Sequence, residues 1–253
     1  MQLDYMRRGV AEFIGTFALI FVGAGSALYG NIVGSAFANG LVIAIMVSSF
    51  AGISGGHFNP AVTFGFFVTR RIAPAMAAFY WVVQLAGAAL AGLALKWIFG
   101  TIAGVSGQET VGGLHLGAPS LQGGISSGQG VMIEAILTFF LVLVVFATAV
   151  DVLGAFDKIA GLAIGLTITF GVLMGGGLTG AALNPARAFG PELAADYWTN
   201  AWVWYVGPLA GGALAAVLYE VLYLGRPAET DEEPPAGEGI DPLAPAPATD
   251  APA

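Results

Sequence analysis

Cysteine is absent from this 253-residue sequence, and charged residues are scarce. Without cysteine the chain can form no disulfide and carry out no thiol chemistry, although this absence does not identify a compartment. Only 9% of the residues are charged, whereas a soluble domain carries about 25%. The chain therefore lacks the charge needed to cover a water-facing surface.

Charge is missing altogether from some long parts of the chain. The stretches without Asp, Glu, Lys or Arg are 13–69, 72–95, 135–150 and 159–186. Crossing a bilayer takes roughly 20 apolar residues, and charge-free stretches on this scale are typical of membrane spans. We therefore predict an integral membrane protein. The apolar run that follows Arg7 and Arg8 is too long for a signal peptide, so we expect it to be retained as the first span.

The net charge of −8 is concentrated near the end of the chain. Seven of the sixteen acidic residues follow Arg226, in a segment rich in Pro and Ala. Such a segment cannot bury enough apolar area to offset the entropy of ordering it. We expect residues 225–253 to form a disordered acidic cytoplasmic tail, and we expect the protein to have no nucleic-acid partner.

The hydrophobic pattern predicts an all-α membrane protein with six transmembrane helices and two half-helices. The predicted spans are 9–29, 37–53, 74–98, 129–150, 159–177 and 201–224. Two further apolar stretches, Pro60–Thr69 and Pro185–Ala195, are too short to cross. Each would be roughly 16 Å long as a helix, which is about half the thickness of the hydrocarbon layer.

The two halves of the chain repeat each other. His57–Val62 corresponds to Ala182–Arg187, 125 positions later, and Gly40–Ile43 corresponds to Gly165–Ile168 at the same offset. Each half has an odd number of spans, so the second must insert upside down relative to the first, as in the inverted repeats of many transport proteins. We predict an N-terminal segment at 1–8 and a first half at 9–99. A connector at 100–128 leads to a second half at 129–224 and a tail at 225–253.

Lys and Arg indicate the orientation in the membrane. Most of them fall on one side in this topology: Arg7, Arg8, Arg70, Arg71, Lys158 and Arg226. Only Lys96 falls near the other side. By the positive-inside rule, both termini are expected to be cytoplasmic and the connector external. We predict a multi-pass protein of the cell membrane.

Each predicted half-helix begins with the same triplet, Asn59-Pro60-Ala61 in the first half and Asn184-Pro185-Ala186 in the second. An Asn side chain can accept from free backbone N–H groups at a helix start, and Pro at the first helical position lacks an N–H that would have no partner. A single copy would indicate only an ordinary helix start. Two copies at equivalent points of an inverted repeat indicate more, because non-helical backbone at membrane depth is tolerated only inside protein or along a wet cavity.

Half-helices that enter from opposite faces bring their N-termini together near the midplane. Each end carries roughly half a positive charge, so the paired ends raise the barrier for cations and protons. Asn59 and Asn184 can cap their helices and still point an amide N–H into a pore. A water or alcohol oxygen that accepts a hydrogen bond from both amides would break the chain of hydrogen bonds between successive molecules in the pore.

The segments 54–63 and 184–187 resemble the paired loops of the aquaporin, or major intrinsic protein, family. The resemblance extends in order and spacing over residues 9–224. It implies a homotetramer with one pore in each subunit, and a channel that passes water and, in some members, other small uncharged solutes such as glycerol. We expect no cofactor, and no metal site, because neither His57 nor His115 has other metal-ligating residues near it in the sequence.

The resemblance also implies an outer selectivity filter. Arg187 would be its cationic wall, and counting from the two motifs puts the other filter positions at Asn39, Val172 and Ala181. Strict water channels of the family combine an aromatic residue with a His here, and glycerol facilitators use two aromatics. The residues in this chain resemble instead the small-residue filters of some plant nodulin-like members that pass metalloid hydroxides.

Glu12 and Glu134 are carboxylates at equivalent repeat positions within the membrane. A proton relay is conceivable, but loops that descend into the membrane need acceptors for their unpaired N–H groups, and the family uses its matching glutamates in this way. We therefore expect Glu12 and Glu134 to support the loops, with His57 packed behind its loop. Arg187 is expected to face the pore, and the alternative is that it extends to the outer interface.

These features predict a passive channel for water and small uncharged solutes (glycerol, urea and metalloid hydroxides) that excludes protons and ions. A strictly water-selective channel is the alternative, because Ala188 and the pair Trp204-Tyr205 resemble the water-type members. An ion-coupled carrier would need an ion site at membrane depth, and a junction protein of the same fold would look similar. The sequence contains no Ser-His, paired-Asp or His-Glu-x-x-His arrangement that would support an enzyme.

Overall fold

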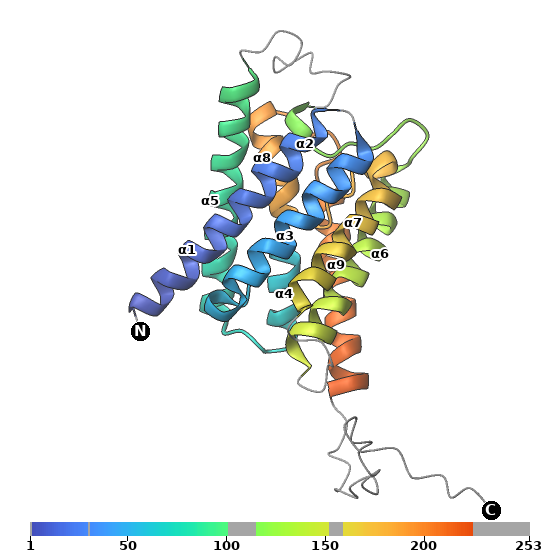
Figure 1. Ribbon diagram of the computed structural model, residues 1–253. Coiled ribbons are helices and arrows are strands. Elements are labelled where there is room, and N and C mark those ends of the chain that lie inside the picture. Colours follow the sequence, from blue (N-terminus) through green and yellow to red (C-terminus); the bar gives the residue numbers. More distant parts are fainter. Residues whose placement is uncertain (1, 30, 101–114, 152–158, 225–253) are drawn as a thin grey trace, which may run out of the picture.

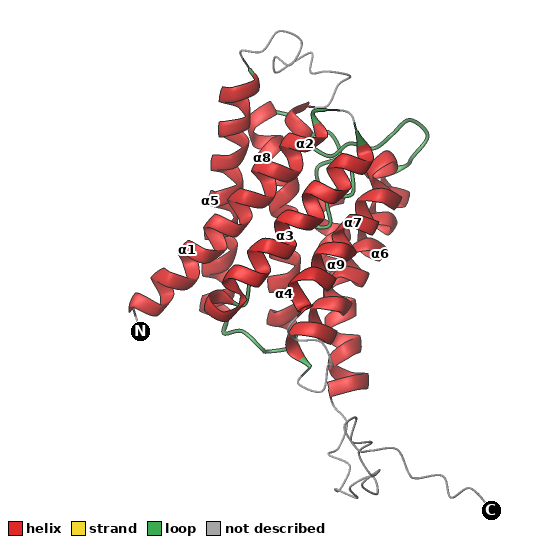
Figure 2. Ribbon diagram, in the orientation of Figure 1, coloured by secondary structure: helices red, strands yellow, loops and turns green. Residues whose placement is uncertain are grey.

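The computed structural model of the protein describes residues 2–29, 31–100, 115–151 and 159–224. Every regular element in these ranges is a helix, with no strand among them (Figure 2). Six helical segments there are long and apolar enough to cross a membrane. The prediction of an all-α membrane protein with six transmembrane helices and two half-helices is confirmed. The predicted tail, 225–253, and part of the predicted connector lie outside the described residues.

The helices follow the order of the predicted repeat. Those of the first half are α1 (Gln2–Leu19), the π-helical turn η1 (Ile20–Ala24), α2 (Gly25–Ala27), α3 (Ile32–Ser54), α4 (Pro60–Val68) and α5 (Pro74–Phe99). Those that follow are η3 (His115–Gly117), α6 (Ser127–Val145), η4 (Phe146–Val150), α7 (Ala160–Thr179), α8 (Pro185–Ala195), α9 (Val203–Tyr219) and η6 (Glu220–Leu224). The predicted half-helices are α4 and α8.

Two helices begin well before the predicted spans. α1 begins at Gln2 rather than at 9, and its first turns carry an i,i+4 ion pair in which Arg8 Nε lies 2.9 Å from Asp4 Oδ2. α3 begins at Ile32 rather than at 37, because the Asn31 side chain caps it by accepting from Gly34 N at 3.0 Å. Hydropathy locates the part of a helix that crosses the membrane, whereas caps and surface ion pairs decide where the helix starts.

The two half-helices lie in opposite halves of the bundle. In Figure 1, α4 lies in the lower half and α8 in the upper half. Around them α3 packs against α7, α6 against α9, and α5 against both α1 and α8. The spans therefore enclose the region where the N-termini of α4 and α8 meet.

Glycine allows α3 and α7 to cross in direct backbone contact. A Cβ on Gly40 would lie 2.5 Å from the carbonyl oxygen of Gly165, and a Cβ on Gly165 would lie 2.4 Å from that of Gly40. Any side chain at either position would push the two helices apart. Close backbone approach through small residues is the usual way in which membrane helices pack, since lipid offers no hydrophobic driving force.

The outward faces of the bundle are apolar. Large hydrophobic side chains are exposed along the spans, for example Leu41, Leu90 and Phe170. Aromatic side chains stand near the ends of spans, with Trp97 80% exposed in the last turn of α5 and Trp202 51% exposed just before α9. An apolar belt with aromatic residues at its rims is the surface that a bilayer solvates.

Candidate pore and selectivity filter

The motif asparagines cap the two half-helices in the same way. Asn59 and Asn184 both have extended backbone, with φ of −155° and −157°. The Asn59 Oδ1 accepts from Ala61 N at 2.8 Å, and the Asn184 Oδ1 accepts from Ala186 N at 2.9 Å. Pro60 and Pro185 occupy the first helical position of α4 and α8. Each motif asparagine thus satisfies a backbone N–H group at the start of its own half-helix.

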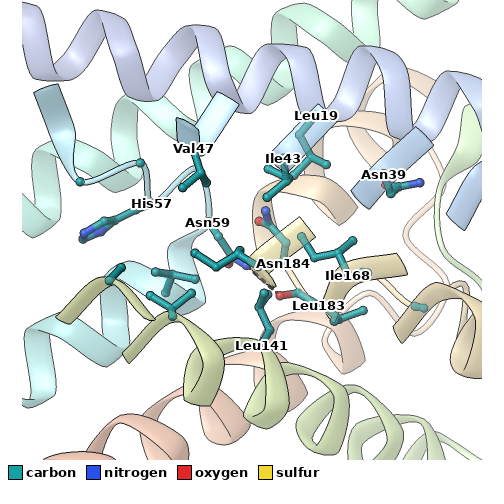
Figure 3. A pocket seen from close by; sticks show the side chains of 18 residues that line it. Leu19, Asn39, Ile43, Val47, His57, Asn59, Leu141, Ile168, Leu183 and Asn184 are labelled. Atoms are coloured by element: carbon teal, nitrogen blue, oxygen red, sulfur yellow. Dashed lines mark hydrogen bonds between the residues drawn. The ribbon is translucent and has the colours of Figure 1, made fainter. Parts of the chain in front are cut away.

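The same asparagines join the two loops. Asn59 Nδ2 donates to the carbonyl of Leu183 at 2.9 Å, and Asn184 Nδ2 donates to the carbonyl of Phe58 at 2.9 Å. Phe58 and Leu183 have positive φ values of 48° and 53°, a conformation that costs a non-glycine residue of order 1–3 kcal/mol. This strain turns both carbonyls toward the opposite loop. Each amide keeps a second N–H, and both asparagines line one cavity, where they lie close together in Figure 3.

Glu12 holds the first loop from behind. Its Oε1 accepts from the Ser54 hydroxyl at 2.7 Å and from His57 N at 2.9 Å. Its Oε2 accepts from Phe58 N at 2.7 Å and from Gln84 Nε2 at 2.9 Å. The carboxylate is fully buried, and both of its oxygens are occupied by hydrogen bonds from the strained loop backbone and from the Ser54 and Gln84 side chains.

Glu134 holds the second loop in the same way. Its Oε1 accepts from the Thr179 hydroxyl at 2.7 Å and from Ala182 N at 3.0 Å, and its Oε2 accepts from Leu183 N at 2.8 Å. It is also fully buried. Neither Glu12 nor Glu134 is among the residues that line the two cavities of the pore. The geometry favours loop support over a proton relay.

His57 both packs behind its loop and borders the inner cavity. Its Nδ1 lies 3.0 Å from the Thr63 hydroxyl, and its ring centroid lies 4.4 Å from that of Phe66. Burial lowers the pKa of the His57 imidazole to about 3, so the ring is neutral in the ordinary pH range. Among the described residues, no group of His, Cys, Asp or Glu is arranged to hold a metal ion.

Two cavities follow one another along the bundle: the inner cavity lies at the junction of the two half-helices, and the outer cavity lies beside Arg187. The inner one, with a volume of about 30 Å³, contains both motif asparagines and is otherwise lined mostly by aliphatic side chains. At roughly 10–15 Å³ for each molecule, it holds about two waters. The outer cavity, of about 170 Å³, is lined by Arg187 together with small and polar residues such as Ser35 and Gln122.

The four predicted filter residues lie where one cavity gives way to the other. Asn39 and Ala181 line the inner cavity, and Val172 and Arg187 line the outer one. Asn39 is one helical turn from Ser35 of the outer cavity, and Ala181 lies between Gly180 of the outer and Ala182 of the inner cavity. All four are buried, with exposed fractions from 2% to 6%.

Arg187 is anchored beside the outer cavity. It is 5% exposed, and its Nη1 donates to the carbonyl of Gly117 at 2.9 Å. That carbonyl is presented by η3, where three successive residues have positive φ, of 38° at His115, 55° at Leu116 and 79° at Gly117. The structure thus holds Arg187 within the protein and does not extend it to the outer interface.

Sequence reasoning missed Glu192. This side chain lies in α8, is 1% exposed, and accepts from the Tyr205 hydroxyl at 2.7 Å. A signal was present, since Glu192 is the one acidic residue inside the predicted half-helix Pro185–Ala195. Gln84 was also missed as a partner of Glu12, because its position in the repeat corresponds to Pro208 and carries no polar match.

A bundle of apolar helices that encloses two joined half-helices, with one cavity at their junction and a second cavity lined by the buried Arg187, defines a membrane channel. The family profile described as "Major intrinsic protein" matches residues 1–219 of the chain. The chain belongs to the major intrinsic protein family, and it is a channel rather than an enzyme.

Relatives include Aquaporin TIP1-2 of Zea mays, 41% identical over 236 residues that make up 88% of each chain. Another is Probable aquaporin TIP3-2 of Arabidopsis thaliana, 40% identical over 260 residues, covering 96% of this chain and 91% of the relative. Among solved structures, the aquaglyceroporin from Plasmodium falciparum superimposes with a TM-score of 0.77 at 26% identity, covering 86% of this chain and 96% of that one.

Proposed function

We propose that the chain conducts water and small uncharged solutes, such as glycerol, urea and metalloid hydroxides, passively and without protons or ions. The observation that carries this proposal is the lining of the two cavities. Of the residues that form it, Arg187 alone bears a full charge, and none has a Phe, Tyr or Trp side chain. A path with one fixed cation and no anionic site favours uncharged solutes.

Exclusion of protons follows from the joined half-helices. Asn59 and Asn184 stand on one cavity wall with their helix ends behind them. Their free amide N–H groups would donate to the oxygen of a passing water and turn its two O–H donors away from the asparagines, so that neighbouring waters cannot relay a proton past it. The partial positive charges of α4 and α8 add to the barrier for cations.

The solute range rests on the filter. Asn39, Val172, Ala181 and Arg187 offer a rim without aromatic bulk, which should admit a molecule the size of glycerol. The names of the relatives are compatible with this proposal, since some are aquaporins and one is an aquaglyceroporin. A strictly water-selective channel is the alternative.

An ion-coupled carrier fits less well. Such a carrier would use membrane-depth carboxylates as its ion site. Glu12 and Glu134 instead accept hydrogen bonds from the backbone of the two loops and from neighbouring side chains at 2.7–3.0 Å. We further propose a homotetramer in the cell membrane with both termini cytoplasmic. Arg7 and Arg8 at the start of α1, and Arg70 and Arg71 between α4 and α5, support this orientation.

The passive mechanism can be tested in proteoliposomes. Glycerol uptake down its own gradient should proceed at the same rate whether or not ionophores have dissipated Na⁺ and H⁺ gradients. Empty liposomes serve as the control for leakage. Uptake that stops when either ion gradient is removed would overturn the channel proposal in favour of a carrier.

A further inference from the structure

The amide of Asn39 is held between its own helix, α3, and the π-helical turn η1. Its Nδ2 donates to the carbonyl of Ser35 at 2.8 Å, to the Ser35 hydroxyl at 3.3 Å and to the carbonyl of Gly23 at 3.3 Å. Because carbonyl oxygens only accept, the nitrogen must be the atom that faces them. In Figure 3 the Asn39 side chain lies well apart from Asn59 and Asn184.

Gly23 provides the room for this arrangement. A Cβ built on Gly23 would lie 2.2 Å from Asn39 Oδ1, 2.8 Å from its Cγ and 3.2 Å from its Nδ2. The whole amide therefore occupies the volume that any side chain at position 23 would need. Normal contacts between carbon and oxygen are about 3.3–3.6 Å, so a methyl group at this position would displace the amide by about 1 Å.

The place of Gly23 along the pore makes this displacement matter. Leu19 lines the inner cavity and Ala27 the outer one, and Gly23 lies midway between them on the same stretch of chain. Gly23 also belongs to η1, the π-helical turn that interrupts the α-helical pattern between α1 and α2. Single π-helical turns inside α-helices are frequent at functional sites, because they offset the backbone that follows.

We propose that Gly23 determines the width of the selectivity filter by housing the Asn39 amide. With hydrogen at position 23, the amide rests against the backbone of η1 and leaves the path open. With a side chain there, the amide loses its bond to the Gly23 carbonyl and moves toward the cavity that Asn39 lines. This inference rests on the proposed solute range, in that a wider filter is what admits solutes larger than water.

Four variants in proteoliposomes test the proposal: Gly23→Ala, Asn39→Ala, the double variant and Gly34→Ala. Gly34→Ala is the matched control, because a Cβ there would make only ordinary contacts of 3.4–3.7 Å with Asn31. Gly23→Ala is expected to lower glycerol and urea permeability about tenfold relative to water, the scale of a modest overpacking penalty at the barrier. The double variant should recover the permeability of Asn39→Ala, and Gly34→Ala should match the wild type.

Two results would overturn the proposal. One is a glycerol-to-water ratio in Gly23→Ala equal to that of the wild type. The other is a loss of permeability in Gly23→Ala that the double variant does not recover, because the amide would then not be the cause. If Gly23→Ala does not fold, the double variant should still fold and conduct as Asn39→Ala does, and its failure to fold would equally contradict the assignment.

The same variants separate this inference from the proposed function. If the wild-type protein excludes glycerol and urea, the proposed solute range is wrong. Water permeability then carries the test of Gly23, since an amide displaced toward the cavity narrows the path for water as well. It should fall in Gly23→Ala and recover in the double variant.

Discussion

Glu134→Gln tests how the second pore loop is held, and its effect can be worked out from the contacts of the carboxylate. The two oxygens accept from the Thr179 hydroxyl at 2.7 Å, Ala182 N at 3.0 Å and Leu183 N at 2.8 Å. A Gln side chain replaces one oxygen with an NH₂ group, so in either orientation one backbone N–H loses its acceptor and faces another donor.

The magnitude follows from the two losses. A buried donor left unpaired costs about 1–3 kcal/mol, and the remaining bonds fall from about 1.5–3 kcal/mol each, their value with a charged acceptor, to about 1 kcal/mol. Glutamine is uncharged, so the variant no longer bears the cost of desolvating a buried charge, and this offsets part of the loss. We expect the folding stability to fall by about 3 kcal/mol, a drop of about 6–12 °C in melting temperature for a protein of this size.

Thermal unfolding of the purified protein in detergent measures this effect, paired with water and proton permeability for each folded channel. Glu192→Gln is a matched control, because Glu192 is also buried but its carboxylate accepts only from the Tyr205 hydroxyl, at 2.7 Å, a hydrogen bond that a Gln oxygen can also accept. The control should lower the melting temperature much less. A Glu134→Gln protein that melts like the wild type, or that folds normally and leaks protons, would refute loop support.

Three further predictions concern the pore. Arg187→Val should raise the flux of uncharged solutes and admit protons or cations, measured with a pH-sensitive dye inside the liposomes, and an unchanged ion barrier would show that the half-helices suffice. Val172→His combined with Asn39→Phe should reduce glycerol passage much more than water passage, and equal reduction would contradict the filter assignment. Because burial lowers the pKa of His57 to about 3, its ring gains no proton between about pH 8 and pH 5. Water permeability should show no titration in that range, and a midpoint at about pH 6.5 that His57→Gln removes would contradict this.

The half-helices and their supports could be predicted because each has a local mark in the sequence. A mostly apolar stretch that is too short to cross, preceded by Asn and beginning with Pro, predicts α4 and α8. Glu12 and Glu134 could be predicted because a carboxylate within an apolar span needs partners, and descending loops have N–H groups to offer. In the structure these carboxylates accept from the N–H groups of the two residues before each motif asparagine.

Other contacts could not be predicted, because they depend on how distant segments dock. Asn59 donates to a carbonyl 124 residues away, and no local pattern reveals that partner. The carbonyl of Gly117 that receives Arg187 comes from the connector, where composition predicts only a loop. The place of Gly23 was hidden as well, since a glycine in an apolar span has many uses, and only the position of the Asn39 amide shows which one applies.

Stopped-flow measurement on proteoliposomes, run with water, glycerol, urea and boric acid on one preparation, tests the central claim most directly. The account predicts that water and at least glycerol-sized uncharged solutes cross faster than in empty liposomes, with a weak temperature dependence, while an internal pH dye records no proton leak. Passage of water with exclusion of glycerol, urea and boric acid alike would contradict the assignment of Asn39, Val172 and Ala181 to an open filter.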